Sequence, residues 1–462
     1  MKTIFFTSFR GILMLGCMLH LSCDSFVETG LPTNQLTGEA VFNDKTTADA
    51  AMRAVYASIR DSGLLSGSSA GLSAHLGCYA DELDFYGSTS NTAADFYDNS
   101  VLPLNAGVKN FWNTTYRQIY GANAIYEGVS QSTGIAQPDA EKLKGEALFV
   151  RALLHLYLVN LFGDIPYITT TDYVTNSHVS RMASDEVYLR IIEDLEMATS
   201  LLPEEYEGFG RARPNKFAAQ ALLARAYLYS GAWAEATNSA SAVLNQIGLY
   251  ADEPDVSKVF LKECTETIWQ LPPTPEGRHT AQGATFTLLA APPQFVALTP
   301  DLVDAFAPGD LRRTHWISSI SGPSGNFFYA SKYKQYVTES ASKEYTVVLR
   351  TAEIYLIRAE ARARQGELTS ALEDLNHVRV SAGLNALDGL GQQQIVDAIF
   401  QERRLELFTE FGHRFFDLKR AANVDEVLGS VKPGWDTTDR FLPIPESEIS
   451  ANPNLLPQNP GY

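Results

Sequence analysis

Cysteine is rare in this sequence. Four of the 462 residues are cysteine, namely Cys17, Cys23, Cys78 and Cys264. So few cysteines exclude a small scaffold built on disulfides. No Cys-x-x-Cys pair occurs, which excludes zinc ribbons and related structural zinc sites. We expect Cys78 and Cys264 to be buried free thiols; a single disulfide between them is the alternative.

Positive charge is also scarce. Lys and Arg number 36 against 54 Asp and Glu, and the formal net charge is −18 at pH 7. Removal of residues 1–22, which contain Lys2, Arg10 and no acid, leaves 34 bases against 54 acids, a net charge of −20. Nucleic-acid binding depends on clustered Lys and Arg that neutralise phosphates. The composition therefore excludes nucleic acid as a partner.

Motifs that hold cofactors or metals are missing. The sequence has no glycine-rich phosphate loop, no His-Glu-x-x-His and no Gly-x-Ser-x-Gly, and its eight histidines are scattered. These absences argue against a P-loop enzyme, a zinc protease and a serine hydrolase of the common types. We therefore expect no cofactor, no metal site, no catalytic residues and no enzymatic activity.

One charged segment supports a catalytic alternative. In QERRLELFTEFGHRFFDLKR, residues 401–420, a helix would place Glu402, Glu406 and Glu410 on one face. Paired carboxylates can cleave glycosidic bonds. However, arginines alternate with these acids, which is typical of a structural network of ion pairs. We expect such a network; a surface-tethered glycoside hydrolase is the alternative.

Long hydrophobic runs are lacking as well. No segment after the first 22 residues has 18 consecutive apolar residues, so we expect no membrane-spanning helix there. The nearly uncharged run at 11–21 is too short to span a membrane as a helix. Because it follows the cationic Lys2 and Arg10, it has the pattern of an export signal.

A cysteine follows this apolar run. Ser22 precedes Cys23, and the chain becomes polar directly afterwards. We predict a lipoprotein signal peptide over residues 1–22, with Cys23 as the acylated first residue of the mature protein. An ordinary signal peptide or acylation of Cys17 is the alternative, and His20 stands where such signals usually carry Leu. Acyl chains would anchor the protein without a spanning helix.

Helical periodicity is strong in most of the chain. With 45% hydrophobic and 19% charged residues, the composition is that of a globular protein. Segment 140–162 has apolar residues at helical spacing from Leu143 to Leu161, which predicts an amphipathic helix. Segment 183–203 predicts another helix, with Ser184 as its N-cap.

Two helix–glycine–helix segments resemble each other. Residues 217–244 and 353–378 align when Gly366 is placed on Gly231, a shift of 135 residues. Small residues before the turn allow two helices to approach closely, and the glycine supplies the turn. The aligned pairs are Ala224 with Ala359, Ala226 with Ala361, Ala236 with Ala371, and Val243 with Val378. This spacing is typical of tetratricopeptide-type helix pairs, which stack on one another; a generic helical hairpin is the alternative.

Two internal segments lack helical periodicity. Residues 62–105 and 271–345 are rich in Gly, Ser, Thr, Pro and aromatics, which predicts long loops with short strands. The proline-rich tail 431–462 is expected to be nonhelical. The fold class is therefore mainly α: a tetratricopeptide-type helix-pair scaffold, or α superhelix, over about 40–270 and 346–425, with a loop-rich irregular ligand-binding part. We expect one domain from residue 23 to 462.

Aromatic residues in these loops indicate ligand binding. A sugar ring has an apolar face and a rim of hydroxyls, so it suits a flat aromatic side chain flanked by short polar ones. Loops on a rigid scaffold often carry such sites; for each single aromatic residue, packing of its own loop is the alternative. Trp316→Ala or Tyr86→Ala is predicted to weaken glycan binding without unfolding. The candidate ligand-binding residues are Asp81, Phe85, Tyr86, Asn91, Tyr97, Trp316, Tyr329 and Tyr333.

The charged segment and the tail together resemble a known family. ERRLELFTEFGHRFFDLKR at 402–420, followed by LPIPESEISANPNLLPQNPGY at 442–462, is similar to the closing signature of the SusD/RagB family of Bacteroidetes. Phe411 before Gly412 is a small departure from that pattern. Upstream segments also resemble the family in the same order, so the resemblance covers essentially the whole mature chain.

The resemblance implies a surface-exposed lipoprotein that is lipid-anchored in the outer membrane. Family members have a tetratricopeptide-type scaffold, bind glycans without cleaving them, and act with a TonB-dependent SusC/RagA-like transporter. The resemblance thus implies capture of oligo- or polysaccharide and its delivery to that transporter. A peptide-binding member of the family is the alternative. The family motifs do not identify the ligand residues.

Overall fold

A computed structural model describes residues 41–462 of the chain. Residues 42–462 form one compact unit. The predicted signal peptide 1–22, the domain start at residue 23, and both candidate acylation sites, Cys23 and Cys17, lie outside the described residues. Within them, one helix is long and apolar enough to cross a membrane, but its apolar window is 94% buried inside the protein.

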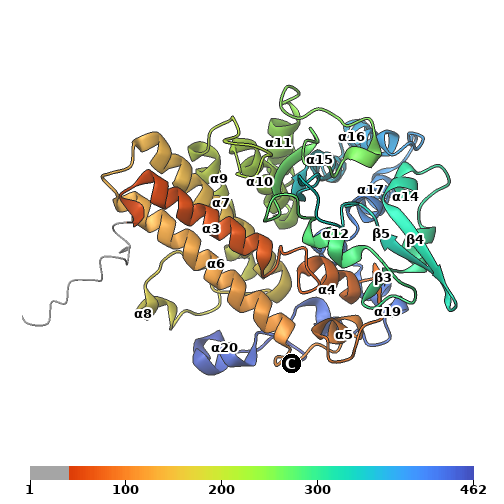
Figure 1. The fold of residues 1–462 in the computed structure, drawn as a ribbon, viewed down its shortest axis with the longest axis horizontal. Coiled ribbons are helices and arrows are strands. Elements are labelled where there is room, and N and C mark those ends of the chain that lie inside the picture. The colour runs from red at the N-terminus through yellow and green to blue at the C-terminus, as the bar shows by residue number, and fades with distance from the viewer. Residues whose placement is uncertain (1–40) are drawn as a thin grey trace, which may run out of the picture. The chain divides into compact units, whose positions relative to one another are not determined.

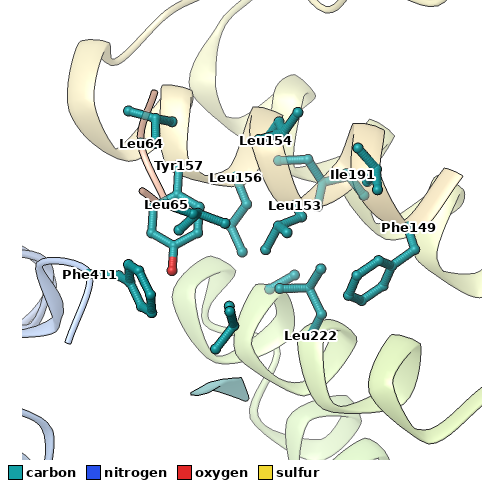
Figure 2. Packing of buried hydrophobic residues seen from close by; sticks show 14 of the residues in the cluster. Leu64, Leu65, Phe149, Leu153, Leu154, Leu156, Tyr157, Ile191, Leu222 and Phe411 are labelled. Carbon is teal, nitrogen blue, oxygen red and sulfur yellow. The ribbon is translucent and has the colours of Figure 1, made fainter. Parts of the chain in front are cut away.

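That helix, α7 (Gln137–Phe162), lies in the largest hydrophobic core. Every residue from 145 to 159 is buried, so the predicted helix is confirmed but its predicted amphipathic character is wrong. The charged residues of this stretch are buried as well, because Glu146 is paired with Arg213 and Arg151 with Asp194. Figure 2 shows Leu153 of α7 pointing toward Leu222, while Leu154 points away to the other side of the helix.

The helices pack as a succession of antiparallel neighbours. Figure 1 shows α3, α6, α7 and α9 side by side, followed by α10, α11, α15 and α16. This succession matches the predicted stack of helix pairs. The further bounds are α3 (Lys45–Asp61), α6 (Ala106–Gln131), α9 (Ser184–Leu201), α10 (Lys216–Ser230), α11 (Trp233–Leu244), α15 (Thr351–Arg364) and α16 (Leu368–Ser381).

The two repeated segments form the pairs α10–α11 and α15–α16. Gly231 and Gly366 end the first helix of each pair with φ of +79° and +83°, a left-handed conformation that glycine adopts without steric cost. The residues aligned between the segments are all buried, and α11 packs against α15. The prediction of stacked helix pairs with small residues at their crossings is therefore confirmed.

The N-terminus of α9 differs from its prediction. Ser184 does not cap the helix with its side chain. Asp164, from the loop after α7, instead accepts hydrogen bonds from the backbone N and the Oγ of Ser184 at 2.9 and 2.8 Å. The acceptor thus comes from another segment, a contact that local sequence does not reveal.

The loop-rich segments contain short elements that periodicity missed. Helix α4 (Leu72–Tyr79) is buried at every residue, so it has no polar face and no helical pattern. The others are too short to show a period. They are α5 (Thr92–Tyr97), α12 (Ala281–Phe286), α13 (Pro300–Asp304), α14 (Leu311–His315), and the strands β1 (Leu83–Phe85), β3 (Val296–Leu298), β4 (Ile317–Gly322) and β5 (Gly325–Ala330).

The remaining elements connect and close the scaffold. The tail 431–462 was predicted to be nonhelical. It contains one short helix and two 3₁₀ turns, so this prediction is only partly correct. A two-stranded sheet, β2 with β6, leads into α15. The elements are α8 (Tyr173–Asn176), β2 (Thr267–Leu271), β6 (Thr346–Arg350), α17 (Gln392–Leu407), α18 (His413–Arg420), α19 (Val424–Val431), α20 (Glu446–Ala451), and the 3₁₀ turns η3 (Val256–Lys258), η4 (Thr437–Arg440) and η5 (Pro453–Leu455).

The thiols of Cys78 and Cys264 are free and buried. This confirms the expectation from the sequence, and it excludes a disulfide between these two residues. Burial raises the pKa of both thiols to about 12. Both groups are therefore neutral at pH 7 and unreactive as nucleophiles.

Candidate functional site

A small antiparallel sheet brings the two loop-rich segments together. Its strand order is β1-β3-β5-β4, so residues near 85 lie beside residues near 297 and 328. The ladder continues past β1, because the backbone N of Tyr86 donates to the carbonyl O of Phe295 at 2.7 Å. Candidate residues from two distant parts of the chain therefore share one sheet.

One face of this sheet presents aromatic rings outward. Side chains alternate between the two faces of a strand, so Phe327 and Tyr329 share the face opposite to Phe328, which packs on the core. Tyr86 joins them: its ring contacts Phe327 edge-to-face with centroids 5.5 Å apart, and it is 40% exposed. We call Tyr86, Phe327 and Tyr329 the aromatic face.

Phe85 and Tyr97 support this sheet from its edge. Both are half-buried against the second hydrophobic core, with ring centroids 6.3 Å apart. Tyr97 donates from its hydroxyl to Asp84 at 3.3 Å, and Lys432 Nζ lies 4.0 Å from the centre of its ring. Burial, and then the Asp84 carboxylate, raise the pKa of Tyr97 to about 12. The rings of Phe85 and Tyr97 thus mainly support the edge strand β1 and offer little exposed surface for a ligand.

A cleft of about 650 Å³ adjoins the sheet. Phe295 belongs to both, since it lines the cleft and its ring contacts Phe85 edge-to-face at 5.9 Å. Most of the residues that line the cleft are polar. The lining residues are Arg60, Asp61, Ser68, Ser69, Asn91, Pro273, Thr274, Arg278, His279, Thr280, Ala281, Ala284, Thr285, Gln294, Phe295 and Thr346.

Asn91 is a predicted candidate that lines this cleft. Its Oδ1 accepts from the backbone N of Ala93 at 2.9 Å and so caps α5. Its Nδ2 has no hydrogen-bond partner among residues 41–462. The amide is therefore held by its oxygen and keeps two N–H donors for a ligand.

Three predicted residues are in the interior. Trp316 is 2% exposed, and its Nε1 donates to the carbonyl O of Val256 at 2.9 Å. Tyr333 is buried, and its hydroxyl accepts from the backbone N of Val347. Asp81 is buried between Arg414 at 2.7 Å and Arg404 at 3.1 Å. Each of the three packs against a distant segment, and their role as ligand contacts stays a prediction.

Other cleft and sheet residues were missed by sequence reasoning. Phe327 stands two residues before Tyr329, so the alternation of a strand would have placed both on one face. Phe295 follows Pro292 and Pro293, and no local pattern distinguishes it. Arg60 lies in the last turn of α3, within the segment that the sequence assigns to the helical scaffold.

The carboxylates of the charged segment form the expected ion-pair network. Glu406 lies 2.5 Å from Arg350 and 2.8 Å from Arg312, and Arg312 also contacts Glu402 at 2.6 Å. Burial alone would raise the pKa of Glu406, but the guanidiniums of Arg350 and Arg312 lower it to about 2. Glu410 is held by Arg350 and Lys332. The structural interpretation of this segment is confirmed.

The protein is thus a stack of helix pairs. Its irregular part carries a cleft lined mainly by polar residues beside an aromatic face, which is the candidate ligand site. Two family models match the chain. One, described as starch-binding and associating with the outer membrane, matches residues 74–228, and the other, described as the SusD family, matches residues 301–462. SusD-like protein P2 of Formosa agariphila is 30% identical over 418 residues, 78% of this chain and 81% of the relative. The chain therefore belongs to the SusD/RagB family, as its closing motifs predicted.

Solved structures agree on the fold. A SusD superfamily protein of Parabacteroides distasonis has a TM-score of 0.79 at 23% identity, covering 93% of this chain and 100% of that chain. A laminarin-binding SusD-like protein has a TM-score of 0.76 at 24% identity, covering 90% and 99%. At these identities the similarity concerns the fold. It confirms the predicted mainly α class with a tetratricopeptide-type scaffold.

Proposed function

We propose that this protein is a non-catalytic, cell-surface lipoprotein that binds glycans. In this proposal it captures oligo- or polysaccharide and delivers it to a TonB-dependent SusC/RagA-like transporter of the outer membrane. The observation that carries the proposal is the 650 Å³ cleft with an aromatic face beside it. Membership of the SusD/RagB family and the laminarin-binding structural relative support it.

The chemistry of this region suits a saccharide. The half-exposed ring of Tyr86 offers an apolar surface for the C–H face of a sugar. Asn91 offers free amide N–H groups in the adjoining cleft, which suit sugar hydroxyls. An apolar platform next to a few polar groups is the usual composition of small-ligand sites.

The carboxylates support binding without cleavage. A glycoside hydrolase needs two carboxyl groups that flank the scissile bond. Among the described residues that line the cleft, Asp61 is the one acid, and Arg60 binds both of its oxygens at 2.6 Å. Glu402, Glu406 and Glu410 are occupied by buried ion pairs elsewhere.

The anchor and the transporter belong to the same proposal. A membrane tether at Cys23 would hold the protein beside an outer-membrane transporter, and the matching family model is described as associating with the outer membrane. Labelling of cells with radioactive palmitate tests the tether. The label should be lost in Cys23→Ala and kept in Cys17→Ala; the reverse result would make Cys17 the acylated residue. Co-purification with a TonB-dependent transporter from membranes tests the partner.

Glycan binding is tested by isothermal titration calorimetry on laminarin and on acidic oligosaccharides. Tyr86→Ala should weaken binding by about 1–3 kcal/mol, judged by analogy with the loss of base–aromatic stacking. Tyr173→Ala is the matched control, because Tyr173 is 81% exposed and lies in a separate groove of about 540 Å³ between α6, α8 and α20.

The controls separate the alternatives. A loss in Tyr173→Ala, with Tyr86→Ala unchanged, would move the site to the other groove. Binding of peptides but of no glycan would favour the peptide-binding alternative. A reducing-sugar assay tests catalysis directly: release of reducing ends that needs the folded protein would overturn the non-catalytic part of the proposal.

A further inference from the structure

We propose that the cleft selects glycans that carry anionic groups, with Arg278 as the residue that binds the carboxylate or sulfate. This inference rests on the proposed function and specifies its substrate class. It is drawn from the charge distribution around the cleft and from the lack of any partner for the Arg278 side chain in the described protein.

The guanidinium of Arg278 is free. Arg278 is exposed on the wall of the cleft, and its side chain has no hydrogen-bond or ion-pair partner within residues 41–462. Most arginines in that part of the chain are paired with a carboxylate or bonded to a carbonyl. An unpaired guanidinium on a cleft wall keeps five N–H donors and a full charge for a ligand.

The backbone that carries Arg278 is nevertheless fixed. Gly277 has a φ of +89°, and a Cβ there would lie 2.1 Å from the carbonyl O of Glu339. The backbone at Gly277 therefore lies very close to the backbone at Glu339. The backbone N of Gly277 donates to Ser342 Oγ, and Ser342 Oγ donates to the carbonyl O of Arg278 at 3.0 Å. Because this backbone is already ordered, binding costs the freedom of the side chain but not that of the loop, which favours affinity.

The acids around Arg278 are already engaged. Asp61 lines the same cleft but is bound through both oxygens by Arg60, which also donates to Thr274 at 2.8 Å. Glu276 accepts from the backbone N of Ser342 at 2.9 Å and lies 3.9 Å from Lys262. Arg278 is therefore not neutralised by the acids of its own loop or of the opposite wall.

The cleft has a charge opposite to that of the protein. Its charged lining residues are Arg60, Arg278 and Asp61, a net charge of +1, in a chain of net charge −18. A neutral glycan would not require a positively charged lining in an otherwise acidic protein. A polyanion would be repelled by most of this surface, so it requires a local positive site to bind.

The geometry of guanidinium suits both anions. A planar guanidinium binds a carboxylate or a sulfate through two parallel N–H···O bonds, which lysine does not reproduce. His279 is next to Arg278, and its Nδ1 contacts the carbonyl O of Thr280 at 3.2 Å. Since a carbonyl oxygen only accepts, Nδ1 carries the proton of the neutral imidazole and Nε2 is an acceptor, so the second donor along the cleft is the Asn91 amide.

The test measures oligosaccharide binding by titration calorimetry with three probes. Oligogalacturonate carries carboxylates, carrageenan oligosaccharide carries sulfates, and laminarin oligosaccharide is neutral. Wild type should bind at least one acidic probe more tightly than laminarin, and raising NaCl from about 50 mM to about 300 mM should weaken that binding because exposed charges are screened. Which acidic probe binds identifies the anion as carboxylate or sulfate.

Variants locate the effect. Arg278→Gln should weaken the acidic probe about tenfold and leave laminarin unchanged, and Arg278→Lys should recover only part of the loss. Arg117→Gln is the matched control, because Arg117 is also exposed and without a partner in the described protein but lies in the other groove. It should leave all affinities unchanged.

The outcomes distinguish the two proposals. If laminarin binds and neither acidic probe does, the anionic inference is overturned while glycan binding stands. If Arg278→Gln binds the acidic probe as wild type does, the assignment of Arg278 is overturned. If no probe binds to correctly folded protein, the inference and the proposed glycan function fall together.

Discussion

Arg225 and Glu353 form a bidentate ion pair inside the protein. Arg225 Nε donates to Glu353 Oε1 at 2.7 Å, and Arg225 Nη2 donates to Oε2 at 2.6 Å. The side chains are 3% and 2% exposed. Because Arg225 lies on α10 and Glu353 on α15, the pair joins the first helices of the two repeated segments. It fixes how one helix pair stacks on the next.

Breaking this pair should destabilise the protein strongly. Arg225→Met leaves Glu353 charged and unpaired in the interior, at a cost of about 3–5 kcal/mol in the free energy of unfolding. Denaturant unfolding followed by circular dichroism measures it. The control is Arg190→Met, which removes the exposed ion pair with Glu193 and should cost less than about 1 kcal/mol. Equal losses in the two variants would contradict the stated role of burial.

The sequence predicted the features that local pattern determines. The glycines at 231 and 366 and the small residues around them identified the helix pairs, because turn and crossing are both set within one short segment. The alternation of acids and arginines near Glu406 identified a structural network. In each case the residues that decide the structure are neighbours in the chain.

Long-range contacts determine the features that local pattern did not show. Trp316 stands in an irregular segment, and its burial depends on Val256 and Phe260, which no local pattern connects to it. Asp81 resembles a free loop acid until Arg414, more than 300 residues later, is placed beside it. The cleft is also non-local: strand pairing between β1 and β3 brings Asn91 and Phe295 to one place.

Glu82 should make stability depend on pH. It is buried next to β1, its Oε1 has no hydrogen-bond partner in the described protein, and burial and then the Asp81 carboxylate raise its pKa from 4.5 to about 7. Between these values the folded protein holds a proton that the unfolded chain has released. The contribution of Glu82 to the free energy of unfolding therefore falls as pH rises from 4.5 to 7.

Glu82→Gln removes this dependence, because the amide is neutral at every pH. Relative to wild type, the variant should gain about 2–3 kcal/mol between about pH 5 and about pH 8. Urea unfolding of both proteins at the two pH values measures the difference, and the other titrating groups cancel. A gap between variant and wild type that does not change with pH would show that Glu82 is ionised throughout.

Replacing Gly366 by a residue with a side chain should lower the free energy of unfolding. Its φ is +83°, and a Cβ there would meet no atom within 4 Å, so the penalty is purely conformational. Gly366→Ala should cost about 1–2 kcal/mol in the free energy of unfolding, and Gly366→Asn should cost less, since Asn adopts this conformation more readily. Thermal unfolding of the three proteins ranks them. An Asn variant less stable than the Ala variant would contradict the argument.

Trp316→Ala and Tyr86→Ala should separate stability from binding. Trp316 fills a buried site against Phe260, so its truncation should cost about 3–5 kcal/mol of stability through lost burial and a cavity. Tyr86 is partly exposed, so Tyr86→Ala should change the free energy of unfolding by less than about 1 kcal/mol while glycan affinity falls. Denaturant unfolding and calorimetry on the same samples give both quantities. A Trp316→Ala variant that keeps full stability and loses glycan affinity would restore Trp316 as a ligand contact and require that its segment opens when a glycan binds.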